Sequence, residues 1–130
     1  MCFANDLRQV LANLIGNAID ATRDGKIVIR TRRATDWRNG RKGVTITVAD
    51  TGEGMSEHTR RKIFEPFFST KGSTGTGLGL WVTVGIVEKH QGRIKVRSSQ
   101  SPLHQGTVFT VFLPFVELET GEPPRVLHLM

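Results

Sequence analysis

The sequence has a single cysteine, no apolar run long enough to cross a bilayer and no leader-like start. Cys2 has no second cysteine with which to form an intramolecular disulfide or share a metal ion, so we expect it to be a packing residue. No stretch approaches the roughly eighteen apolar residues of a transmembrane helix. The start MCFANDLRQV lacks the basic and apolar regions of a signal peptide. We therefore expect a soluble, cytoplasmic protein, although a longer parent protein with a membrane anchor stays compatible with this sequence.

The chain has 130 residues, of which 38% are hydrophobic and 23% are charged. This length and composition are typical of one globular domain. It contains no internal repeat and no low-complexity linker. We predict a single domain over residues 1–114, followed by a tail over residues 115–130, where periodicity is weak and two prolines are adjacent.

The net charge is +6, and eight lysines and arginines between residues 23 and 42 are opposed by only two aspartates. A basic stripe of this kind can bind nucleic acid. Here, however, the basic residues alternate with apolar ones and flank DWRNGRKG, a pattern typical of a solvated strand and hairpin tip, and no aromatic ladder accompanies them. We therefore expect no nucleic acid partner, while an acidic protein or an anionic ligand stays open.

Hydrophobic periodicity divides the chain into three helices and four strands. We expect the first helix to be capped by Asn5 or Asp6 and to run to about Thr22. The third predicted helix is apolar almost all round, which indicates a buried helix. The remaining elements are strands over 26–33 and 43–50, a short helix over 56–64, a helix over 78–92, and strands over 92–99 and 106–114. This order favours an α/β fold, a two-layer sandwich with a mixed, mainly antiparallel sheet covered on one face by helices.

The first helix contains NLIGNAID, which places Asn13 and Asn17 one turn apart on the same face and Asp20 along the same edge. Oxygen atoms there can complete the coordination of Mg²⁺, which takes few protein ligands and keeps most of its waters. On the helix alone, two surface asparagines are an equally simple interpretation.

The motif DTGEGM follows the second strand directly. Alternation places Asp50 on the same face as Val44, Ile46 and Val48, so its carboxylate faces the helices and requires a hydrogen-bond donor. Glycines at 52 and 54 permit a sharp turn and leave room for a planar group. A surface turn explains the motif equally well in isolation.

In IFEPFFSTK, an apolar anchor of Ile63, Phe64, Phe67 and Phe68 precedes the glycine-rich STKGSTGTGLGL of residues 69–80. That stretch is not a Walker loop, because Lys71 precedes its later glycines, and it lacks the spacing of a dinucleotide-binding turn. It opens into a helix whose N-terminal amides can hold an anion. The aromatic anchor before this stretch is typical of a hinge that seats a mobile segment.

Taken in order, these motifs and GTVFTVFLP resemble the catalytic and ATP-binding domain of sensor histidine kinases. The superfamily, with its Bergerat fold, also includes DNA gyrase, the ninety-kilodalton heat-shock chaperones and MutL. The resemblance extends from about residue 6 to residue 114. NAIDA and FEPFFSTK look like the nitrogen-regulation type of kinase.

The resemblance implies that ATP and Mg²⁺ are the cofactors. Asn17 would ligate the metal with Asn13 assisting, Asp50 would accept a hydrogen bond from the adenine amino group, and Thr107 would support that site. Asn13 and Lys71 would be catalytic. The glycine-rich stretch would be a lid, mobile from about Ser69 to Thr76 without nucleotide and ordered over the phosphates when ATP and Mg²⁺ are bound. The remaining implied nucleotide contacts are Asp20, Gly52, Gly54, Met55, Phe67, Gly75, Thr76, Gly77, Leu78, Gly79 and Leu80.

By the same resemblance, the γ-phosphoryl group would pass to a histidine on a separate helical dimerisation domain and then to a response regulator. The family's acceptor histidine precedes an acidic residue, whereas His58, His90, His104 and His128 do not. We therefore expect a fragment of a longer sensor kinase, monomeric alone and homodimeric in its parent. A related serine kinase or ATPase and a non-catalytic nucleotide-sensing domain are the alternatives.

Overall fold

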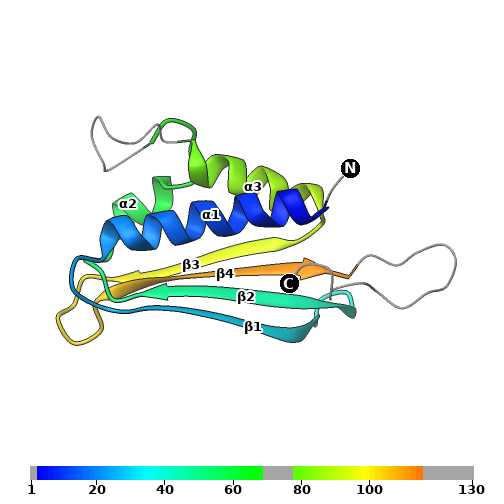
Figure 1. The fold of residues 1–130 in the computed structure, drawn as a ribbon, viewed down its shortest axis with the longest axis horizontal. Helices are drawn as coiled ribbons and strands as arrows, with labels where there is room; N and C mark the ends of the chain where they lie inside the picture. Colours follow the sequence, from blue (N-terminus) through cyan, green and yellow to red (C-terminus); the bar gives the residue numbers. More distant parts are fainter. Residues whose placement is uncertain (1–2, 69–77, 116–130) are drawn as a thin grey trace, which may run out of the picture.

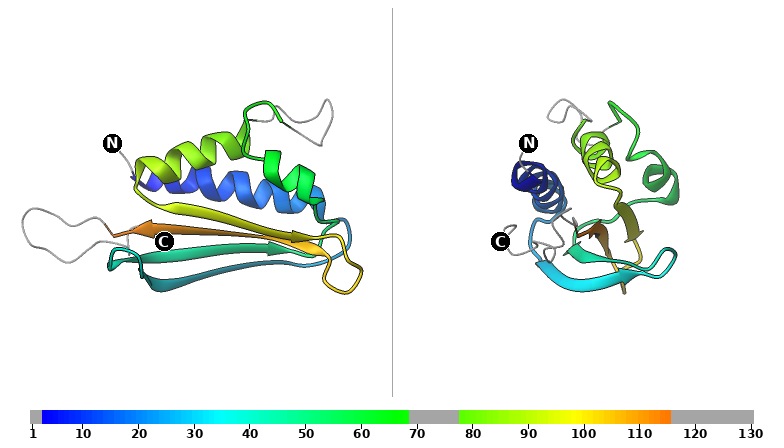
Figure 2. Two further views of the ribbon diagram at one scale, coloured as in Figure 1. Left: turned by 180° about the vertical axis from the view of Figure 1, so that it is seen from behind. Right: turned by 90° about the vertical axis from the view of Figure 1, so that its right-hand side faces the viewer.

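The computed structural model describes residues 3–68 and 78–115, which form two layers (Figure 1). The elements are α1 (Phe3–Ala21), β1 (Ile27–Asp36), β2 (Arg41–Asp50), α2 (Glu57–Lys62), α3 (Gly79–Lys89), β3 (Arg93–Ser99) and β4 (Gly106–Pro114). The helices lie on one face of the sheet, with α3 between α1 and α2 (Figure 2). The predicted two-layer α/β sandwich is confirmed. No helix in the described ranges is long and apolar enough to span a bilayer.

The sheet has the strand order β1-β2-β4-β3, and every neighbouring pair is antiparallel. The described sheet is thus wholly antiparallel rather than mixed. Residues 37–40 connect β1 to β2, where Gly40 has a φ of 71° and donates its N–H to the carbonyl of Asp36 at 2.7 Å. The predicted hairpin at Asn39 and Gly40 is therefore confirmed. Glycine suits this turn because it adopts a positive φ without strain.

The core lies between the helices and the inner face of the sheet. Strand alternation and helical periodicity direct the apolar side chains into it, as the sequence pattern predicts. The buried members are Leu7, Val10, Leu14, Ala18, Val44, Ile46, Val48, Ile63, Val87, Phe109, Val111 and Leu113. Phe115 packs against them and donates its N–H to the carbonyl of Lys42 at 2.9 Å, so ordered structure extends one residue into the predicted tail.

The predicted cap of the first helix is wrong, because α1 begins at Phe3 and Asp6 lies in its first turn. The Asp6 carboxylate instead contacts Lys89 Nζ and His90 Nε2, both at 2.8 Å, at the far end of α3. The hydrogen bond from Lys89, followed by that from His90, lowers the pKa of Asp6. The Asp6 carboxylate therefore joins α1 to the end of α3, although local sequence preference predicts that it caps α1.

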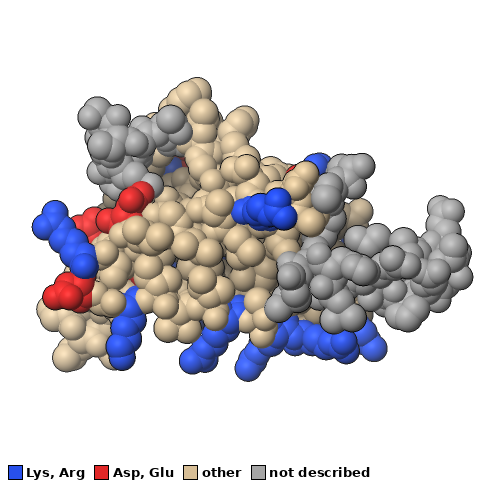
Figure 3. Space-filling view, in the orientation of Figure 1, with Lys and Arg blue, Asp and Glu red and all other residues tan. Residues whose placement is uncertain are grey.

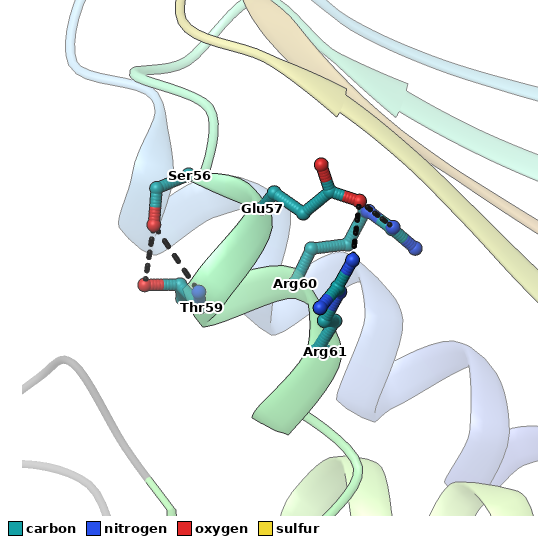
Figure 4. A network of polar contacts seen from close by, with 5 residues as sticks. All are labelled: Ser56, Glu57, Thr59, Arg60 and Arg61. Carbon is teal, nitrogen blue, oxygen red and sulfur yellow. Dashed lines mark hydrogen bonds and ion pairs between the residues drawn. The ribbon is translucent and has the colours of Figure 1, made fainter.

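The α2 helix is shorter than predicted and ends at Lys62. Ser56 caps it, accepting the N–H of Thr59 at 3.1 Å, while Glu57 pairs with Arg60 and Arg61 at 3.0 and 3.4 Å (Figure 4). These exposed ion pairs follow the helical spacing of three and four residues and contribute little individually.

The α3 helix is buried on one side only, which corrects the prediction of an all-round buried helix. Thr83 and Val87 are buried, whereas Trp81 is 50% exposed. The reason is that α1 and the sheet cover only part of the helix surface. Just after the end of α3, the residue with a positive φ is Gln91, at 61°, and not Gly92. Gly92 is required for a different reason, since a Cβ there would lie 2.2 Å from the carbonyl oxygen of Phe112.

An ion pair spans the outer face of the sheet, opposite the helices. Arg93 at the start of β3 donates to Asp36 Oδ2 at 2.6 Å, although two other strands separate β1 from β3. Only 8% of the Asp36 side chain is exposed, and its Oδ1 accepts the N–H of Arg38 at 3.1 Å. The carboxylate therefore joins the hairpin turn to the opposite edge strand.

We expect Asp36→Ala to lower the free energy of unfolding by about 1–3 kcal/mol, because it leaves Arg93 without its charged partner. Urea denaturation monitored by circular dichroism measures this change. The matched control is Asp24→Ala, at an exposed position, with an expected effect within about 0.5 kcal/mol. Equal effects of the two substitutions would contradict the structural role of the Asp36–Arg93 pair.

Candidate nucleotide-binding site

The predicted base-site residues that the structure describes lie at one end of the sandwich. There β2 ends, β4 begins and α1 reaches its C-terminus, at the left of Figure 1. Asp50 is the last residue of β2 and pairs with Thr107 of β4. The antiparallel register thus brings together two polar residues that lie 57 positions apart in the sequence.

Asp50 is a buried carboxylate without a charged partner in the described part of the chain. It is 8% exposed, and its Oδ1 accepts the N–H of Gly52 at 2.8 Å. Burial raises the pKa of Asp50, while hydrogen bonds from the backbone of Gly52 and Thr107 act in the opposite direction. The predicted inward orientation and the need for a donor are confirmed. A buried charge held only by backbone amides is suited to accept a further hydrogen bond from a ligand.

Three glycines allow the backbone to approach closely around Asp50. A Cβ at Gly52 would lie 2.3 Å from the carbonyl oxygen of Ala21, so the turn packs directly on the end of α1. Gly54 has a φ of 72°, and Gly106 has a φ of 144° beside the Asp50 carbonyl. The sharp turn predicted for DTGEGM is confirmed.

A hydroxyl network that sequence reasoning missed connects this turn to β4. Ser98 Oγ accepts the N–H of Met55 at 2.7 Å and lies 2.8 Å from Thr107 Oγ1. Ser98 therefore positions both Met55 and Thr107. The sequence signal that could have identified Ser98 was the alternation along β3, which puts this serine on the same inner face as Ile94 and Val96.

Asn13 joins α1 to the first turn of α3. Its Nδ2 donates to the Gly79 carbonyl at 2.9 Å and to Thr83 Oγ1 at 3.0 Å, and the Thr83 hydroxyl donates to the same carbonyl at 2.8 Å. Its Oδ1 accepts a longer hydrogen bond, of 3.3 Å, from Gln9. The amide nitrogen is thus committed to α3, and the amide oxygen is the end available for a metal or a phosphate-bound water.

The other α1 positions fit the predicted edge. Asn17 is half-buried and Asp20 is exposed. Among the residues that the structure describes, no group of three or more histidine, cysteine or acidic side chains is placed to hold a metal ion. The oxygens of Asn13 and Asn17 are the donors that suit a hard cation, provided that phosphates and water complete its shell.

Phe67 does not belong to the predicted aromatic anchor. Ile63 is buried, and Phe64 and Phe68 pack against the core, whereas Phe67 is 75% exposed. Its φ is 66°, a backbone conformation that residues other than glycine rarely adopt. Leu78, Gly79 and Leu80 lie at the start of α3, where Leu78 is the N-cap residue. The lid residues Lys71, Gly75, Thr76 and Gly77 lie outside the described residues.

Residues 3–117 match the family described as histidine kinase-, DNA gyrase B- and HSP90-like ATPases. The chain belongs to this ATPase family. Its fold also resembles the catalytic domain of histidine kinase ThkA, with a TM-score of 0.68 and 35% identity over 85% of this chain and 67% of that one. It is an ATP-binding catalytic domain of the histidine kinase type, as the motifs predict.

Longer relatives carry the same domain. Sporulation kinase E of Bacillus subtilis is 42% identical over 87% of this chain, and the sensor histidine kinase ZraS of Klebsiella oxytoca is 44% identical over 83%. This chain spans only 14% and 22% of those two proteins. These relatives do not decide the nitrogen-regulation subtype, which stays a prediction.

In this ATPase-family domain, we expect Asp50→Asn to weaken ATP binding by about tenfold to a hundredfold, because a charge-assisted hydrogen bond is lost. Isothermal titration calorimetry measures this loss. The same variant is expected to unfold at an equal or higher temperature at neutral pH. Because the pKa of Asp50 is raised in the folded state, the wild-type free energy of unfolding decreases as pH rises above the ordinary aspartate pKa of 3.8 and through the folded pKa.

Asp24→Asn serves as the exposed control and is expected to change neither ATP affinity nor melting temperature. An Asp50→Asn variant that binds ATP like the wild type would contradict the assigned role of Asp50. An Asp50→Asn variant that neither binds ATP nor folds would contradict the expectation that the buried Asp50 charge destabilises the fold.

We expect Thr83→Val to lower the free energy of unfolding by about 1–2 kcal/mol, since it removes a buried hydroxyl that bonds both Asn13 and Gly79. Amide hydrogen exchange in the first turn of α3 should accelerate as well. Thr47→Val, at a half-buried position of β2, is the isosteric control. Unchanged exchange at the start of α3 would show that Asn13 and Thr83 do not fix this helix.

Proposed function

We propose that this domain transfers the γ-phosphoryl group of ATP to a histidine on a separate helical dimerisation and phosphoacceptor domain, for relay to a response regulator. The observation that carries the proposal is the buried Asp50 carboxylate, which faces the helices at the end of β2 and is held only by backbone amides. An adenine amino group is a fitting donor for such an acceptor. Thr107, Met55, Gly52 and Gly54 would complete the base site.

The phosphates would lie toward the start of α3. Helix N-termini attract anions through their amides and dipole. Asn13 fixes the first turn of α3 to α1 through the Gly79 carbonyl, so the base end and the phosphate end share one rigid support. Lys71 and the amides of residues 75–80 would close over the phosphates.

Asn17 and Asn13 would hold Mg²⁺ through their amide oxygens, with Asp20 on the same edge. When bound, the cation would neutralise phosphate charge, which together with positioning supplies most of the catalysis of phosphoryl transfer. Asn13 stands where a water-activating base would be needed for hydrolysis, and an amide cannot take a proton. This chemistry favours transfer to a protein side chain over hydrolysis.

An acceptor domain would dock beside the lid. Trp81 is 50% exposed and Phe67 is 75% exposed, and these two residues flank the glycine-rich segment on either side in the sequence. Exposed large apolar side chains of this kind often mark protein contacts. The parent protein would dimerise through its helical domain, while this domain alone would be monomeric.

The test is a phosphotransfer assay. The domain is incubated with ATP labelled in its γ-phosphate, Mg²⁺ and the helical acceptor domain of its parent protein supplied in trans. We expect an acid-labile, base-stable phosphoprotein, which indicates phosphohistidine, and its loss with Asp50→Asn or Lys71→Met. ATP binding without any transfer would favour the nucleotide-sensing alternative, and an acid-stable product would favour a serine kinase.

A further inference from the structure

The outer face of the sheet, opposite the helices and the nucleotide site, carries a concentration of positive charge. Alternation places six basic side chains there, of which Arg93 pairs with Asp36 and Arg41 donates to Gln91. The other four are Arg30 and Arg32 of β1, and Lys95 and Arg97 of β3. All four are exposed. Figure 3 shows lysine and arginine side chains that project from the sheet on the side away from the helices. We call these four residues the basic face.

The basic face is not neutralised by the residues that the structure describes. None of its four side chains makes an ion pair or hydrogen bond within the described ranges. Asp36 is the only acidic residue at an outward-facing strand position, and Arg93 already pairs with it. Four positive charges therefore stand on one surface without a partner.

The basic residues form two parallel rows at the two edges of the sheet. β1 and β3 are separated by three strand spacings, or about 14 Å. On the strands between them, Thr45 and Thr47 lie opposite the arginines of β1 and Thr110 lies opposite Lys95, while the larger, half-buried Phe112 lies opposite Arg93. An α-helix with its side chains is about 10–12 Å wide, so it fits between the rows.

The chemistry of the basic face favours a protein carboxylate as its ligand. Arginine has a planar group that binds carboxylates with two hydrogen bonds, and three of the four residues are arginines. Single-stranded nucleic acid is bound by stacking on aromatic side chains. Phe112, which is half-buried, is the only aromatic residue at an outward-facing position of the four described strands. A second copy of this chain would meet the face with the same charge, which disfavours self-association.

We propose that the basic face binds an acidic α-helix of a partner protein, which lies along the sheet between its two rows of positive charge. This site is separate from the nucleotide site, because it lies on the opposite face of the sheet from Asp50 and the helices. A protein can therefore occupy it while ATP is bound.

The probe is a fluorescently labelled helical peptide with glutamates along one face, and its matched control is the same peptide with glutamines. Fluorescence anisotropy measures binding to the wild-type domain at low and at physiological salt. We expect binding of the glutamate peptide only, and we expect it to weaken as salt screens the charges. The test variant is Arg30→Gln/Arg32→Gln/Lys95→Gln/Arg97→Gln, which is expected to bind about tenfold more weakly or worse, since four ion pairs are lost.

The control variant Arg8→Gln/Arg23→Gln/Arg33→Gln/Lys42→Gln removes the same charge. Arg33 of β1 and Lys42 of β2 belong to the same sheet but point to the helix side. ATP binding by both variants verifies that they are folded. Equal loss of peptide binding in the two variants would overturn the proposal, because net charge alone would then explain it. Tighter binding of duplex DNA or of anionic vesicles that depends on the same four residues would overturn it in favour of those ligands.

Discussion

Burial of the Asp50 carboxylate is the constraint on which the geometry of the nucleotide site depends. A charge in this position would be unstable without donors, and the fold supplies them from the backbone of Gly52 and Thr107. Both donors require a close approach of chain segments. Gly52 packs on the carbonyl of Ala21, and Gly106 packs on the carbonyl of Asp50 itself, at distances that no side chain would allow. The end of α1, the end of β2 and the start of β4 are thereby fixed to one another.

A second connection joins this rigid end to the start of α3. Asn13 lies on the same helix as Ala21, and it holds the Gly79 carbonyl together with Thr83. The first turn of α3 is therefore positioned by α1. Gly79 is thereby tied to the core, so the end of the glycine-rich sequence that the structure describes belongs to the rigid part of the domain.

The parts of the fold that follow alternation were predictable from the sequence. Period-two patterns placed Asp50 and Thr107 on the inner face, and the antiparallel register then made them neighbours. The errors have long-range or conformational causes. Asp6 contacts Lys89 and His90, more than 80 residues away, which no local capping preference indicates. Phe67 adopts a positive φ, which is rare for a phenylalanine and which its sequence does not indicate. Ser98 is one of two adjacent serines at the end of a strand and belongs to no motif, so nothing in the sequence singles it out.

The two faces of the sheet have opposite chemistry, and one register determines both. A shift of β2 against β4 by one residue would turn Asp50 outward and bring the outward-facing side chains into the core. The register is held at both ends of this pair. Gly43 lies against the carbonyl of Leu113 at one end, and Gly106 lies against Asp50 at the other. The contacts that build the nucleotide site are therefore the same contacts that keep the rows of arginine and lysine on the surface, so substitutions at these two glycines would disturb both faces together.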